Sequence, residues 1–289
     1  MRPSRLACLV ALAALAACVP ASEALPPAGA GGFATQPSPA TRGEPFTTED
    51  GWTVRIEKVA LSCWITASPP FGSYSGRRYG SGGWLFDASQ PVAVYAPEIS
   101  VGPAIVDIAL RGNYVYVGRD NSRESRRILG VAPEVVERSN APPDEGFEDA
   151  YFGDDLRYPA GDGPSVLLAL RAERAGRVER MDLALGITVY PGSSGRRLAI
   201  DIFEDTVVTR PVGVNVEELF RDSKGRLAFD EFAAADTDGD GVVTIAELKS
   251  ARTTCKCPIT APAHPSGPRP VPDLVDLLEL NAAKILVPR

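Results

Sequence analysis

Apolar and polar residues alternate through most of the chain between residues 50 and 214. In the run 181–189 every second residue is apolar, which is the pattern of a strand with one buried face. A second alternating run, residues 52–65, changes phase part-way along. Many short strands without long amphipathic helices between them predict a mainly β fold, and we expect an antiparallel β-sandwich over residues 47–214.

Three of the predicted strands follow one another closely in the sequence. They cover residues 165–174, 181–189 and 198–203, and turn-forming residues, glycine among them, separate them. Such spacing is typical of consecutive hairpins, so these strands are expected to form a meander. Further short strands are predicted at residues 92–95, 104–110 and 114–117.

The pattern changes after residue 214. Residues 215–254 hold short stretches of helix formers on either side of an acidic loop, which predicts a small α-helical module. Residues 255–289 begin with a proline-rich segment that must be extended. The tail then predicts one amphipathic helix over residues 273–286, which packs these side chains against the body: Leu274, Leu277, Leu278 and Ile285.

The acidic loop, residues 236–247, has carboxylates at a fixed spacing. Three aspartates alternate with other residues, Gly241 follows them, and Glu247 is the twelfth residue. A hard cation such as Ca²⁺ takes six to eight oxygen ligands, which such a run can supply. The run satisfies D-x-[DN]-x-[DN]-G-x5-E and resembles the calcium loop of the EF-hand family.

This resemblance implies a ligand set for Ca²⁺. It consists of the carboxylates of Asp236, Asp238 and Asp240, the backbone carbonyl of Val242, a water held by Thr244, and both carboxylate oxygens of Glu247. Thr244 and Glu247 also form a capping box, which predicts a helix after the loop.

Loops of this family usually pair through a short β-contact, here near Val243. A faint copy of the pattern upstream, residues 220–231, lacks essential acids and is interpreted as a turn. The loop 236–247 therefore has no second loop to pair with, and it is expected to bind Ca²⁺ weakly or to find another partner.

The N-terminus carries a targeting signal. Arg2 and Arg5 precede an apolar run that is too short to span a bilayer. The run ends in Leu15-Ala-Ala-Cys18, which resembles the lipobox of bacterial lipoproteins. The resemblance implies cleavage before Cys18 and acylation of that cysteine, with palmitate as the expected chain. Val19 at the next position favours an outer-membrane lipoprotein that faces the periplasm or the cell surface.

Two N-terminal segments are therefore expected before the folded body. Residues 1–17 are the lipoprotein signal peptide, and the alternative is an ordinary secretory signal cut nearby. Residues 18–46, rich in proline, glycine and alanine, are expected to form a flexible tether.

Charge and histidine content narrow the function. The chain has 37 acidic and 30 basic residues and a single histidine, His264. Acidity argues against nucleic-acid binding, and the single histidine argues against the commonest acid–base and zinc chemistries. Nucleophile-elbow, P-loop and H-E-x-x-H motifs are absent from the sequence. Asp201, Glu204 and Asp205 are the nearest approach to the carboxylate pair of a hydrolase, with Asp201 and Asp205 on one face of the strand, and an exposed sheet face is the preferred explanation for them.

Three cysteines remain after the signal peptide and Cys18. In an oxidising compartment Cys63 is expected to form a disulfide with Cys255 or Cys257, which leaves one thiol over. A metal site built from the C-x-C pair and His264 is the poorer alternative, because it lacks a fourth ligand.

The sequence thus predicts a calcium-binding, lipid-anchored protein of the cell envelope that is not an enzyme, with Ca²⁺ in a structural role. Its partner is expected to be an envelope protein or a glycan of unknown identity, besides the membrane that holds its lipid. The alternative is an adhesin or glycan-binding β-sandwich braced by calcium. In that case the insertion 68–83, with Tyr74 and Tyr79, contacts the sugar.

Overall fold

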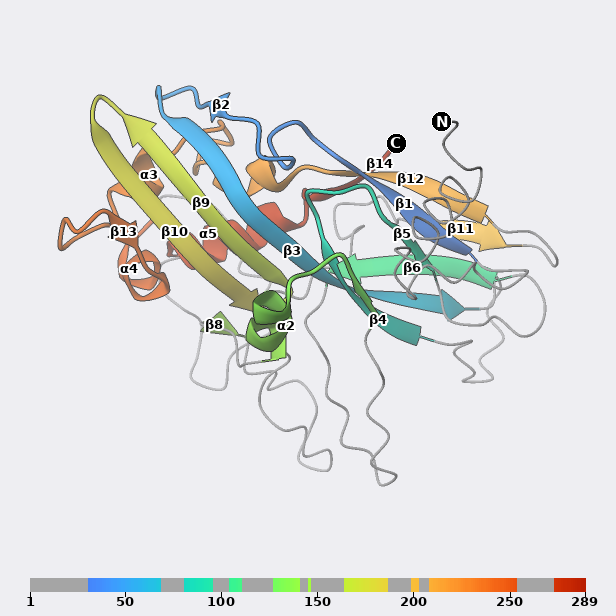
Figure 1. The fold of residues 1–289 in the computed structure, drawn as a ribbon. Coiled ribbons are helices and arrows are strands. Elements are labelled where there is room, and N and C mark those ends of the chain that lie inside the picture. Colours follow the sequence, from blue (N-terminus) through green and yellow to red (C-terminus); the bar gives the residue numbers. More distant parts are fainter. Residues whose placement is uncertain are drawn as a thin grey trace, which may run out of the picture.

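Strands dominate the molecule, as the alternating pattern predicts (Figure 1). The computed structural model describes residues 31–68, 81–95, 104–110, 127–140, 145–146, 164–186, 199–202, 208–253 and 273–289. The fold is mainly β, with two mixed sheets and a few short helices.

The larger sheet is organised around the 16-residue strand β3 (Thr53–Ser68). The first part of β3 pairs with β9 (Val166–Arg174), and the second part lies between β4 (Ser81–Asp87) and β6 (Ala104–Leu110). The register shifts between Ile56 and Lys58. This irregularity is the physical basis of the phase change in the sequence. A bulge inserts one extra residue, so Val59 and the alternating apolar residues after it face the same core as Ile56.

Six shorter elements complete this sheet. They are β2 (Phe46–Thr47), β7 (Arg127–Leu129), β8 (Glu145–Gly146), β10 (Arg177–Gly186), β11 (Ala199–Ile202) and β13 (Val242–Val243). The predicted meander is correct for β9 and β10, which form a hairpin with positive φ at Ala175 (50°) and Gly176 (85°). It is wrong for β11, which pairs with β6 towards the other end of the sheet.

The smaller sheet has the order β14 (Leu286–Pro288), β12 (Val208–Val214), β1 (Gly31–Pro37), β5 (Ala93–Tyr95). Strands β1 and β12 run parallel, as do β4 and β7, β8 and β10, and β10 and β13. The predicted purely antiparallel arrangement is therefore correct only in part.

The predicted tether, residues 18–46, is wrong for its second half. Strand β1 pairs along its whole length with β12, and Phe33 is completely buried. Beyond β1, the hydroxyl of Thr41 donates to the carbonyl of Val214 and accepts from the amide of Val216. The composition of this segment is that of a linker. Its order comes from pairing with the distant strand β12 and from burial of Phe33. Residues 18–30 lie outside the described residues.

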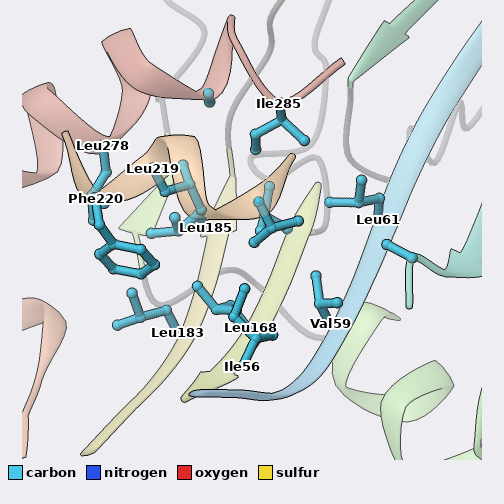
Figure 2. Close-up of a cluster of buried hydrophobic side chains, with 14 of the residues drawn as sticks. Ile56, Val59, Leu61, Leu168, Leu183, Leu185, Leu219, Phe220, Leu278 and Ile285 are labelled. Atoms are coloured by element: carbon cyan, nitrogen blue, oxygen red, sulfur yellow. The ribbon is translucent and has the colours of Figure 1, made fainter. Parts of the chain in front are cut away.

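Helices cover both faces of the β3–β9–β10 region. On one face, α2 (Pro133–Asn140) packs Val135 and Val136 against a small apolar cluster. On the other, η1 (Val216–Phe220) and α5 (Leu274–Ala282) close the main core (Figure 2). The side chains predicted to anchor the tail are all buried there: Leu274, Leu277, Leu278 and Ile285. In a β-sandwich a second sheet would cover the core face of this region. Here η1 and α5 cover that face instead.

None of the helices in the described part of the chain is long and apolar enough to span a bilayer.

Candidate metal centre

The acidic loop joins two short helices beside the β9–β10 hairpin (Figure 1). Helix α3 (Asp230–Ala233) precedes the loop and α4 (Ile245–Ser250) follows it. Gly239 and Gly241 have φ values of 76° and 79°, which glycine adopts without strain and which turn the chain around the acidic side chains. Helix α4 begins with the predicted capping box of Thr244 and Glu247.

Three carboxylates converge inside this loop. One oxygen atom from each of Asp236, Asp238 and Asp240 lies within 4.8 Å of the others. Calcium–oxygen distances are about 2.3–2.6 Å, so oxygen atoms this close together can contact one ion. All three donors are carboxylates, a donor type that favours hard cations.

Backbone amides hold these carboxylates in place. The amides of Gly239 and Gly241 donate to the two oxygens of Asp236 at 2.8 and 3.1 Å, and the amide of Val242 donates to Asp240 at 2.7 Å. Burial raises the pKa of Asp236, but these N–H groups outweigh burial and bring that pKa below its usual value. The carboxylate is therefore charged at neutral pH.

Glu247 connects the two ends of the loop. Its Oε1 accepts from the amide of Thr237 at 3.0 Å, and its Oε2 accepts from the amide of Thr244 at 2.8 Å. Burial and the charge of Asp236 raise the pKa of Glu247, but the hydrogen bonds from Thr244 and Thr237 bring it below its usual value. The Thr244 hydroxyl donates to the same carboxylate, and the side chain of Val242 is exposed.

The loop is also part of the larger sheet. Val242 and Val243 of β13 pair in parallel with Arg180 and Met181 of β10. The Arg180 amide donates to the carbonyl of Gly241 at 2.9 Å. A Cβ at Gly241 would lie 3.0 Å from the Val178 carbonyl, so the close approach of the two strands favours glycine here. A β-contact near Val243 was expected, but no local pattern indicates that its partner is β10.

Helix α3 is held by the body at both ends. Asp50, in the β2–β3 turn, accepts from the amides of Phe229 and Asp230 at 2.7 and 2.6 Å and so caps the helix N-terminus. Arg174 binds the carboxylate of Asp230 at 2.6 Å. At the other end, Arg177 donates to the carbonyl of Ala233 at 2.8 Å.

One further carboxylate adjoins the loop. Glu179 of β10 is 1% exposed, and its Oε1 accepts from Nε of Arg177 at 2.5 Å. Its Oε2 is buried and has no hydrogen-bond partner among the residues that the structure describes. Sequence reasoning missed this residue, although it lies two positions before Met181 and so continues the alternating row of inward-facing residues.

Comparison with protein-family models, with curated proteins and with solved structures finds no match. The functional argument therefore depends on the geometry of this loop and its surroundings.

The other sequence candidates are less informative. Cys63 lies in the core and has no disulfide partner among the described residues, and burial strongly raises the pKa of its thiol. Its predicted disulfide partners lie outside the described residues, as do other predicted functional residues, so the disulfide and these assignments stay predictions: Cys18, Tyr74, Tyr79, Asp205, Cys255, Cys257 and His264. Asp201 lies on β11. The upstream copy of the loop forms a turn between Arg221 and Leu227, as predicted.

Proposed function

We propose that the protein binds one Ca²⁺ in the loop 236–247 and uses the ion as a structural brace, without catalysing a reaction. The observation that carries this proposal is the convergence of the Asp236, Asp238 and Asp240 carboxylates within 4.8 Å. Like charges held this close repel one another, and a divalent cation compensates them. Binding therefore stabilises the folded loop.

The remaining ligands follow the EF-hand pattern. Glu247 lies across the loop from Thr237 to Thr244 and would complete the shell together with the Val242 carbonyl and a water held by Thr244. Strand β10 supplies the β-contact that a single loop of this family needs, since Val243 pairs with Met181. This contact supports binding by one copy of the chain.

The proposed location is the cell envelope. Acylation at Cys18 would anchor the protein in the outer membrane, and the two sheets and their shared core would form a sandwich-like body that meets an envelope partner. Calcium is abundant outside the cytoplasm, so an affinity of about 10⁻⁵ to 10⁻³ M is sufficient for a structural ion.

Calorimetric titration of the chain from Val19 onward, which keeps every described element, tests this proposal. We expect saturable binding of one Ca²⁺, and stabilisation of about 2.7 kcal/mol at a free concentration of about 100 Kd. Asp238→Asn and Glu247→Gln should each weaken binding by at least about tenfold, because they remove a charged ligand.

Asp182→Asn is the matched control, since Asp182 is an exposed carboxylate of β10 that pairs with Arg138. It should leave the affinity unchanged. Absence of binding heat together with equal melting temperatures in calcium and in chelator would refute the proposed function.

A further inference from the structure

Three arginines lie side by side on the outward face of the larger sheet, across the neighbouring strands β3, β9 and β10 (Figure 1). Arg171 of β9 is directly opposite Arg55 of β3 on one side and Arg180 of β10 on the other. Each arginine lies between two buried residues of its strand, so all three point away from the main core. Neighbouring strands are about 4.8 Å apart, and like charges directly opposite one another destabilise a sheet. This arginine row is therefore a destabilising arrangement that an anionic partner would relieve.

The acidic residues of this face compensate only part of its charge. Glu173 pairs with Arg171 at 2.6 Å, and Asp182 pairs with Arg138 of α2. Glu57 is exposed in the bulge of β3. Three basic side chains of the face form no ion pair within the described part of the chain: Arg55, Lys58 and Arg180.

The arginine row ends in an apolar side chain. Val242 of β13 lies opposite Arg180, and among the described residues it is the one exposed large apolar side chain, at 36%. The next residue, Val243, is buried, so Val242 points to the same face as the arginines. Basic and apolar side chains next to each other suit the boundary between lipid headgroups and acyl chains. A soluble polyanion would leave the valine uncovered, so a membrane is the partner that fits better.

We propose that this basic face, which consists of the arginine row with Lys58 and Val242, docks the body on an anionic phospholipid surface. The guanidinium groups bind lipid phosphates, which their planar set of donors matches, and Val242 enters the headgroup region. The chain as a whole has a net charge of −7, so an anionic surface repels the rest of it and the basic face sets the orientation. This inference rests on the proposed function for the location at a membrane, and it does not depend on the ion.

The proposed lipid anchor would keep this face close to a bilayer. Between Cys18 and β1 the chain has only residues 18–30, which span at most about 45 Å when fully extended. Contact between the face and the bilayer is then an intramolecular step at high effective concentration. A few basic side chains are therefore sufficient to hold the body in one orientation.

Cosedimentation of the chain from Val19 onward with phospholipid vesicles tests the inference. The experiment is run in chelator, so that no metal ion bridges lipid and protein. We expect binding to vesicles of equal parts phosphatidylglycerol and phosphatidylcholine, no binding to pure phosphatidylcholine, and weaker binding as the salt concentration rises. The double variant Arg55→Gln/Arg180→Gln should bind about tenfold more weakly or less, since each basic residue near such a surface strengthens binding roughly fivefold.

The matched control is the double variant Arg210→Gln/Lys224→Gln. It removes the same charge from exposed positions outside the basic face, one on β12 and one in the turn after η1, and should leave vesicle binding unchanged. Thermal unfolding shows whether both double variants keep the stability of the wild type. Lys58→Gln, beside the arginine row, provides a second measurement and should weaken binding roughly fivefold.

Three results would overturn the inference: no binding of the wild type to the anionic vesicles, equal binding to neutral vesicles, or equal loss in the test and control variants. Binding of soluble polyglutamate through the same arginines, without binding to vesicles, would assign the face to an acidic protein and would overturn it as well. Calorimetry measures Ca²⁺ binding separately. Failure of the vesicle experiment therefore leaves the proposed ion site intact, and failure of the calorimetric one leaves this test valid.

Discussion

Buried carboxylates in this protein are stabilised where N–H groups surround them, and Asp222 is a clear case. The amides of Lys224 and Arg226 donate to its Oδ1 at 2.9 and 2.8 Å, and the Arg226 guanidinium binds Oδ2 at 2.7 Å. Burial raises the pKa of Asp222, but these donors bring it below its usual value. Asp222 is the third residue of the upstream copy of the calcium loop, and Arg226 provides there the positive charge that an ion would bring.

Asp222→Asn should lower the free energy of unfolding at pH 7 by about 1–3 kcal/mol, because it weakens buried hydrogen bonds to a charged group. The pKa of Asp222 is lower in the folded state, so its contribution is complete above the ordinary aspartate pKa of about 4 and is lost as the pH falls through the folded value. Urea denaturation at pH 7 and near pH 3 measures this. A difference between variant and wild type that is constant over this range would contradict the assignment.

The sequence is most informative about residues whose neighbours are close in the chain. The proposed metal ligands lie within twelve consecutive positions, so their spacing alone predicted that the carboxylates of Asp236, Asp238 and Asp240 come together. The contributions of Glu179 and Asp50 depend on which strand or helix lies beside them. The local sequence does not indicate which elements become those neighbours. The roles of both residues were therefore not predicted.

Among the elements, α3 shows clearly how a helix can depend on its surroundings. Four residues are too few for a helix that is stable by itself. Phe229, its N-cap residue, makes no side-chain capping bond, and Asp50 from the β2–β3 turn performs this role. The ring of Phe229 packs on Trp52 with 5.5 Å between centroids. The body therefore positions the helix that leads into the acidic loop.

Asp50→Ala should destabilise the protein by about 1–2 kcal/mol, since it removes the cap of α3. It should also weaken Ca²⁺ binding, because α3 then samples undocked positions. Thermal unfolding and calorimetry of the variant measure both effects. Asp50→Asn, which keeps a side-chain oxygen as acceptor, is the control and should retain most of the stability. Equal losses in both variants would contradict a capping role.

Strand existence was easier to predict than strand partnership. Alternation identified β10 and the phase change in β3, since both properties belong to one segment. The position of β11 beside β6 was missed, because an alternating segment fits any free edge of a sheet. The parallel pairs were missed for the same reason.

At the scale of the molecule, β1 shows that the folded body begins earlier than composition suggests. Phe33 is completely buried and belongs to the same core as the strands of the larger sheet. The segment is short of apolar residues, and its order comes from strand β12, about 175 residues away in the chain. A pattern that depends on so distant a partner is not visible in a local window.

Phe33→Ala should cost about 3–5 kcal/mol, as expected for removal of a buried aromatic ring. Phe46→Ala is the control, because Phe46 is only partly buried against the same core. Chemical denaturation of both variants measures the difference. Similar small losses would mean that β1 contributes little to the fold.

The pairing of β13 with β10 also bears on solubility. Strand β10 is the outer member of the β3–β9–β10 ladder, and β13 and β8 cover parts of its free side. An uncovered strand edge is a template for pairing with another chain. The proposed ion would hold β13 in place and so keep that edge closed, and loss of the ion would then expose the protein to self-association.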